Sequence, residues 1–295
     1  DVAQPALWRV DLGRFEADAL GNLTEGVEEF LLPAPTGGEA LGVAVGDINN
    51  DGVADIIVSG FSFGDASVRR LASIWVSLGD TPFRRWRLPP AGATGNSEAT
   101  TMSASLENIR ITGYAFDPAG HRRASLWTID AGETIQITHT FLPGDAPSAA
   151  RTQTVDNDET ITVGGSRTEV GGREQPALWF TNSNGGTWKT SNLALPGGFD
   201  GGRVNGIIAI LIGLVAAGDV SGPAGQSAAL WQIGPGGAAA AIDLNDLYVD
   251  LPPGVRLTEA SFLLPYVEQD NLFYVIVGGA RDAAGQAHGF VALAD

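Results

Sequence analysis

A three-residue pattern, in which a small residue and a branched aliphatic residue precede a tryptophan, recurs along this chain. Its last four tryptophans follow one another at equal intervals: Trp75, Trp127, Trp179 and Trp231. A fixed period of roughly 50 residues indicates copies of one supersecondary unit that buries its apolar face only against its neighbours. The chain is therefore predicted to be an array of such units, with the tryptophans packed between them.

Other landmarks recur in step with the tryptophans. A strand-like run that ends in glycine precedes each tryptophan, and a strand that closes in Leu-Pro follows it. With one further alternating segment at the start, each unit contains four consecutive strands joined by turns rich in Gly, Asp and Asn. The 40 glycines and 16 prolines of the 295 residues also favour short strands over long helices.

Repeated four-stranded antiparallel meanders predict an all-β fold, a β-propeller. Five pairs of first and second strands predict five blades closed by both termini. Six blades remain the alternative, because one copy of the third strand is surplus. The closing strands are expected in residues 1–33, four full blades in 39–90, 98–143, 148–196 and 201–252, and the last blade in 258–295.

The composition excludes several classes of partner. There are 34 acidic and 17 basic residues, and the formal net charge of −17 repels nucleic acid and anionic lipid. The longest apolar run, 207–217, is far shorter than the roughly 20 residues of a membrane-spanning helix. We therefore expect neither nucleic-acid binding nor membrane insertion. Because the first residue is Asp1 rather than methionine, we expect a processed, extracellular or periplasmic chain.

One loop between a first and a second strand carries a strong chemical pattern. Asp47, Asn49, Asp51 and Asp55 place side-chain oxygens at alternate positions of a glycine-containing loop. Ca²⁺ binds about six to eight oxygens, and this spacing wraps them around one point. These four side chains and the carbonyl of Val53 are therefore the predicted ligands of one Ca²⁺. The alternative is a long solvated turn rich in Asx residues.

The strands on either side of this loop, in residues 46–60, and the following strand, 73–79, resemble the FG-GAP and VCBS repeats of exported and cell-surface β-propellers. That family includes the integrin α-subunit type. The resemblance implies calcium between the first two strands of a blade. It covers a single unit, because the corresponding turns of the other units lack the acidic loop.

Signals for catalysis are weak. His121, His139 and His288 are isolated, and there is no cysteine and no His-x-x-x-His or Gly-x-Ser-x-Gly motif. Some five-bladed propellers are glycosidases that use carboxylates in a central funnel. Glu98 and Asp219 could face such a funnel, but nothing in the sequence singles out a pair. No catalytic residue is predicted.

Two segments are candidate partner sites. Arginines gather in the first two units of an otherwise acidic chain, and the turn within 207–215 is apolar. The alternatives are arginines neutralised within the surface and a hairpin buried under the surplus N-terminal strand. The predicted partner-binding residues are Arg69, Arg70, Arg84, Arg85, Arg87, Ile210 and Leu211.

Together these features favour an exported, non-catalytic β-propeller that binds another protein or a cell-surface assembly, with an anionic glycan as a further candidate partner. The alternative is a carbohydrate-active propeller, either a lectin or a glycoside hydrolase with funnel carboxylates. Two or three carboxylates about 5 to 10 Å apart in one pocket would favour the hydrolase. An apolar funnel would favour the protein-binding scaffold.

Overall fold

The computed structural model describes most of the residues of the chain. Within them, no helix has the length and apolarity needed to cross a membrane. The described residues are 4–10, 16–17, 23–25, 27–34, 36–49, 51–64, 69–79, 81–89, 95–104, 108–130, 136–145, 147–156, 159–181, 186–210, 213–234, 239–248, 251–268 and 271–294.

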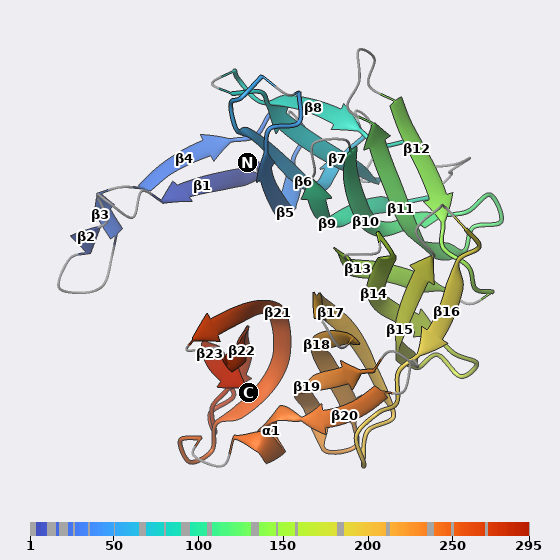
Figure 1. Ribbon diagram of the computed structural model, residues 1–295, viewed down its shortest axis with the longest axis vertical. Coiled ribbons are helices and arrows are strands. Elements are labelled where there is room, and N and C mark those ends of the chain that lie inside the picture. The colour runs from blue at the N-terminus through green and yellow to red at the C-terminus, as the bar shows by residue number, and fades with distance from the viewer. Residues whose placement is uncertain are drawn as a thin grey trace. The chain divides into compact units, whose positions relative to one another are not determined.

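Five antiparallel sheets succeed one another as the blades of a β-propeller, which confirms the predicted all-β, five-bladed fold (Figure 1). In the first four sheets, four strands lie side by side in chain order. The first blade comprises β5 (Gly38–Gly46), β6 (Asp55–Phe63), β7 (Arg70–Ser77) and β8 (Arg84–Arg87). The second comprises β9 (Ser97–Ala104), β10 (Asn108–Phe116), β11 (Arg122–Asp130) and β12 (Gln136–Phe141).

The later blades repeat this order. The third comprises β13 (Ser148–Val155), β14 (Ile161–Thr168), β15 (Glu174–Thr181) and β16 (Lys189–Asn192). The fourth comprises β17 (Gly201–Ile210), β18 (Gly213–Gly222), β19 (Gly225–Ile233) and β20 (Ala239–Asp243), followed by the short helix α1 (Leu244–Leu247). The fifth sheet contains β21 (Arg256–Glu268), β22 (Asn271–Arg281) and β23 (Ala287–Ala294).

The N-terminal strands form two small sheets of their own. In one, β1 (Ala6–Val10) pairs with β4 (Val27–Leu31), and in the other β2 (Glu16–Ala17) pairs with β3 (Leu23–Glu25). The backbone N–H of Leu32 donates to the carbonyl of Pro5, just as Leu88 donates to Ala72 in the first blade. The β1–β4 pair therefore has the structure of the third and fourth strands of a blade.

The chain divides into two compact units. The first contains residues 1–111, 115–120 and 127–140, and the second contains 112–114, 121–126 and 141–295. In the second unit, the core lies between neighbouring sheets: Leu178 of the third blade packs with Val204 and Trp231 of the fourth. The polar site described below lies within this second unit.

The four repeated tryptophans are fully buried, which confirms the expected packing role. Each indole Nε1–H also donates to a carbonyl that follows the fourth strand of the preceding repeat. The acceptors are Pro33 for Trp75 (3.0 Å), Pro89 for Trp127 (2.9 Å), Pro143 for Trp179 (2.9 Å) and Ala194 for Trp231 (2.7 Å). Each tryptophan therefore links two successive repeats by apolar burial and by one directed hydrogen bond.

Candidate functional site

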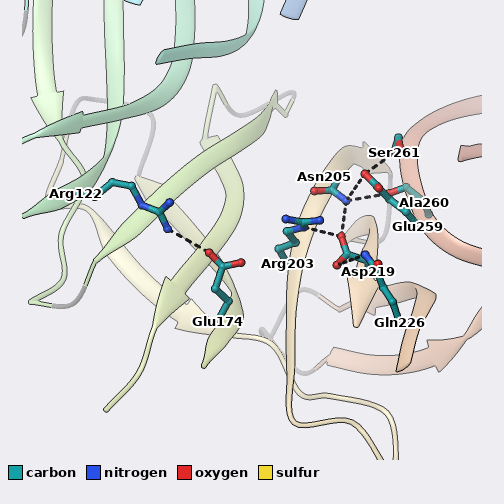
Figure 2. A network of polar contacts seen from close by, with 9 residues as sticks. All are labelled: Arg122, Glu174, Arg203, Asn205, Asp219, Gln226, Glu259, Ala260 and Ser261. Carbon is teal, nitrogen blue, oxygen red and sulfur yellow. Dashed lines mark hydrogen bonds and ion pairs between the residues drawn. The ribbon is translucent and has the colours of Figure 1, made fainter. Parts of the chain in front are cut away.

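A network of charged and amide side chains lies in the second unit (Figure 2). Its residues come from four successive blades, and several of them lie at the beginning of a strand. They are Arg122 on β11, Glu174 on β15, Arg203 and Asn205 on β17, Asp219 on β18, Gln226 on β19, and Glu259 and Ser261 on β21. Arg151 on β13 interacts electrostatically with four of them: Arg122, Glu174, Arg203 and Asp219.

Bulges in the first strands aim several of these side chains. The pairing register of β13 shifts around Arg151, and that of β17 shifts around Asn205. A third shift, in β21, surrounds Ser261. Because a bulge leaves one residue outside the ladder and bends the strand, it can turn that side chain away from the direction of its neighbours.

Asp219 lies at the centre of the network, with its side chain only 6% exposed. Its Oδ1 accepts hydrogen bonds from Arg203 Nε at 2.7 Å and from Asn205 Nδ2 at 3.0 Å, and its Oδ2 accepts one from Gln226 Nε2 at 3.1 Å. Burial alone would lower the pKa of Arg203, but the hydrogen bond and charge of Asp219, with smaller contributions from Glu259 and Glu174, raise it. The charged guanidinium of Arg203 is therefore held in place by Asp219.

Asn205 joins a second carboxylate to this pair. Its Nδ2 also lies 3.4 Å from Oε1 of Glu259, and the Ser261 hydroxyl lies 3.2 Å from the same oxygen. Asp219 and Glu259 thus both lie within hydrogen-bond reach of one amide nitrogen. Glycosidases use two carboxylates about 5 to 10 Å apart beside one sugar residue.

Arg151 differs from the other two arginines of the network. Arg122 pairs with Glu174 at 3.2 Å and Arg203 pairs with Asp219, but Arg151 makes no ion pair within the described part of the chain. Its Nε is buried without a hydrogen-bond partner among those residues. Burial lowers the pKa of Arg151, and Arg203 and Arg122 lower it further, while Glu174 and Asp219 raise it. A guanidinium that stays charged here is well suited to bind an external anion.

The loop predicted to bind calcium lies in the first unit, between β5 and β6. The carboxylate of Asp47 accepts from the backbone N–H groups of Asp51 (3.1 Å) and Gly52 (2.8 Å). Asp55 is completely buried and accepts from Ile48 N (2.9 Å) and Gly79 N (2.8 Å).

These aspartates therefore fold the loop by binding its backbone. Asn49 and Val53 are exposed on the same loop. Among the described residues, no group of three or more His, Cys, Asp or Glu side chains is arranged to hold a metal ion. Calcium binding by Asp47, Asn49, Asp51, Val53 and Asp55 stays a prediction.

The two predicted partner segments differ in exposure. Arg70 binds Glu98 at 3.2 Å and stacks over the ring of Phe61. Arg84 and Arg87 are exposed on β8, whereas Arg69 and Arg85 are half-buried. Ile210 packs against the core of the second unit rather than forming an exposed patch, and Leu211 lies outside the described residues.

The three histidines do not belong to the residues of the network in Figure 2. His139 stacks on Trp127 with ring centroids 5.0 Å apart, and burial lowers its pKa to about 4. His288 contacts Asp282 at 3.1 Å on an exposed turn, and His121 is exposed. Of the two carboxylates considered as funnel residues, Asp219 belongs to the network and Glu98 is paired with Arg70 in the first unit.

Sequence reasoning missed Arg122, Arg151, Glu174, Arg203, Asn205, Gln226, Glu259 and Ser261. The signal that could have revealed part of this set is the repeated glycine of each second strand. Gly165 and Gly218 lie opposite the bulges that contain Arg151 and Asn205. In an aligned set of repeats, the residue that follows the partner of that glycine is the one that the bulge leaves unpaired.

Comparison with solved structures identifies proteins of similar architecture. Trypanosoma rangeli sialidase in complex with 2,3-difluorosialic acid aligns with a TM-score of 0.54 and 10% identity, over 97% of this chain and 51% of that chain. A mutant of that sialidase with trans-sialidase activity aligns with a TM-score of 0.53 and 10% identity, over 99% of this chain and 52% of that chain. This chain thus spans about half the length of these sialidases. At this identity the similarity concerns the fold.

Comparisons at the level of sequence are sparse. A model of the Gp5 C-terminal repeat, in three copies, matches residues 149–170, which contain β14 and most of β13. No curated protein matches the sequence.

These findings correct two expectations. The expected relationship to FG-GAP and VCBS repeats is wrong. The family model that matches is that of the Gp5 C-terminal repeat, and the solved structures of similar fold are sialidases. The single acidic loop on which it rested folds by binding its own backbone. The non-catalytic protein-binding scaffold is likewise wrong, since the propellers of similar fold are sialidases.

Proposed function

We propose that this chain is a carbohydrate-active propeller that binds an acidic sugar at the network around Arg151. The observation that carries the proposal is the state of Arg151. It is charged, its buried Nε has no partner among the residues that the structure describes, and it lies beside arginines that already have carboxylate partners. A ligand carboxylate would supply the missing acceptor in a bidentate geometry.

The groups around Arg151 suit the remainder of a sugar. The Glu259 carboxylate can accept hydrogen bonds from sugar hydroxyl groups, and the Asn205 amide can donate hydrogen bonds to them. The Ser261 hydroxyl can both donate and accept. Arg122, Glu174 and Arg203 are each about one-third exposed, so a ligand can reach them. The sialidase neighbours, one of them bound to 2,3-difluorosialic acid, make sialic acid the first acidic sugar to test.

The binding test is calorimetric titration of the full chain with sialic acid and glucuronic acid, and with uncharged galactose and arabinose as controls. We expect the acids to bind and the neutral sugars to fail at the same concentrations. Arg151→Met should weaken acid binding roughly 10- to 100-fold, because a charge-assisted pair is lost. Its melting temperature should not fall, because Nε of Arg151 makes no hydrogen bond with the described parts of the chain. Equal binding of neutral sugars, or unchanged binding by Arg151→Met, would contradict the proposal.

Hydrolysis is a second candidate activity of the same site, favoured by the Asn205 bridge between Asp219 and Glu259. Fluorogenic glycosides of sialic acid and glucuronic acid test it. A hydrolase should release the fluorophore, and Glu259→Gln should lower kcat while leaving binding of the free acid nearly unchanged. If the chain binds the acids but releases the fluorophore from neither glycoside, it is a lectin.

Two sequence-based expectations belong to this proposal. One is an extracellular or periplasmic location, where a glycan ligand would be available. The other is one Ca²⁺ in the loop that contains Asp47 and Asp51, which would stiffen the first blade.

A further inference from the structure

A pocket of about 330 Å³ lies on the third blade, at the turn between β14 and β15. This volume is at the lower end of the roughly 300 to 1,000 Å³ of small-molecule sites. No residue of the network described above lines it. Its lining residues are Arg167, Thr168, Glu169, Val170 and Asn192.

Arg167 lines this pocket, and its guanidinium carries five N–H donors. Its Nε is buried and has no hydrogen-bond partner within the described residues. The group packs against the backbone at Gly144, where a Cβ would lie 3.1 Å from that nitrogen, and Gly144 has a φ of 137°. Glycine at this position therefore leaves the space that the guanidinium occupies.

Glu169 and Asn192 provide acceptors and a further donor. Asn192 Nδ2 donates to Glu169 Oε1 at 3.2 Å, which fixes both side chains. The second oxygen of Glu169 accepts no hydrogen bond from the parts of the chain that the structure describes. A fixed donor beside a fixed acceptor suits hydroxyl groups, which donate and accept at once. An acidic ligand would be repelled by the Glu169 carboxylate, so the pocket suits an uncharged sugar residue.

The pocket and the network share one hairpin. Thr168, at the pocket, pairs with Glu174 across the β14–β15 ladder, and Glu174 binds Arg122 and lies in the field of Arg151. In the adjoining ladder, Arg167 pairs with Ser148, which precedes Arg151 by three residues on β13. Three residues of a strand span about 10 Å, and the neighbouring strand that carries Arg167 lies roughly 5 Å further away. Linked sugar residues can span such a distance.

We infer that this pocket is a second sugar-binding position, which takes a neutral sugar residue linked to the acidic residue held at Arg151. The inference rests on the proposed function and adds a ligand class to it. The preferred ligand is an oligosaccharide that contains both an acidic and a neutral residue, with the neutral residue over the β14–β15 turn.

The test compares each free acid with an oligosaccharide that contains it, by calorimetry on the full chain. The pairs are sialic acid with sialyllactose, and glucuronic acid with glucuronosyl-xylose. The oligosaccharide of at least one pair should bind roughly 5- to 10-fold more tightly than its free acid, through one or two added hydrogen bonds. Arg167→Met and Asn192→Ala should each remove most of this gain and leave the affinity for the free acid within about twofold.

Arg173→Met is the matched control, because Arg173 lies on the same turn, is exposed, and pairs with Asp200 outside the pocket. Arg173→Met should change neither the affinity for the free acid nor the affinity for the oligosaccharide. Oligosaccharides that bind no more tightly than the free acids would overturn the inference, as would pocket variants that weaken both ligands equally. If no acid and no oligosaccharide binds the wild-type chain, the proposed function itself fails. If the free acids bind and their binding depends on Arg151, but the oligosaccharides bind no more tightly, only the second sugar-binding position fails.

Discussion

Gly165 and Gly218 set the geometry of the site although they carry no side chain of their own. A Cβ on Gly165 would lie 2.0 Å from the carbonyl oxygen of Ala149, and one on Gly218 would lie 1.9 Å from that of Arg203. Real side chains do not approach this closely. Each glycine therefore permits the bulge opposite it, and the bulge aims Arg151 or Asn205.

Gly218→Ala should consequently lower the free energy of unfolding by about 2 to 4 kcal/mol, because the bulged strand must move away. It should also weaken binding of acidic sugars, because Asn205 and Arg203 would shift. Gly289→Ala is the control, since a Cβ there meets nothing within 4 Å. Denaturant unfolding measures both variants, and an equal effect of the two would contradict this role of the bulge.

His139 makes the stability of the first unit depend on pH. Burial lowers its pKa from 6.5 to about 4, so between these values the unfolded chain binds a proton that the folded chain does not. This contribution to stability is complete above pH 6.5, declines as the pH falls, and is lost near pH 4. It is worth less than about 3 kcal/mol, because the ring is partly exposed.

His139→Phe retains a ring against Trp127 and removes the titration. Between pH 7 and pH 5, the melting temperature of the wild-type chain should therefore fall more than that of the variant. Parallel pH profiles for the two proteins would show that His139 is not buried in its neutral form.

At the scale of elements, the tryptophan of each third strand joins one repeat to the next. Trp179 is fully buried and donates to Pro143. Trp179→Phe should destabilise the chain by about 2 to 4 kcal/mol, through a lost hydrogen bond and an unfilled volume. Trp86→Phe, at a partly exposed position outside the repeat, should cost less than about 1 kcal/mol. Similar costs for the two variants, measured by chemical unfolding, would contradict the linking role.

The loop between β5 and β6 carries the calcium prediction. If it binds Ca²⁺, saturating calcium should raise the melting temperature by a few degrees relative to a chelator, because the ion binds only the folded loop. Asp51→Ala should abolish this shift, since Asp51 is exposed and its loss spares the buried Asp55. Asp145→Ala, at an exposed acidic turn of another blade, should retain it. Identical melting of the wild-type chain with calcium and with chelator would refute calcium binding.

Strands and repeats could be predicted from the sequence, because the tryptophans, the glycine-ending runs and the Leu-Pro closures recur at one period. The bulges were missed, because the repeated glycine opposite each of them was interpreted only as the end of the second strand. Arg151 and Asn205 therefore look like ordinary strand residues in the sequence. The apolar run that includes Ile207 was interpreted as an exposed hairpin, but Ile207 is buried because it belongs to the core between sheets.

At the scale of the whole molecule, five blades account for the chain, and closure by both termini stays a prediction. Function was harder to predict than fold. The network draws residues from four blades, and side chains that are far apart in sequence meet only after the sheets have formed. The net charge of the chain also gave no indication of the site. An overall charge of −17 conceals the guanidinium of Arg151, whose buried Nε has no hydrogen-bond partner among the described residues.

The most direct measurement of the central claim is a crystal structure of the full chain with sialyllactose or glucuronosyl-xylose. We expect the carboxylate of the ligand to bind the guanidinium of Arg151, and the hydroxyl groups of the ligand to lie near Glu259 and Asn205. Sugar bound at any other surface, with the carboxylate away from Arg151, would contradict it.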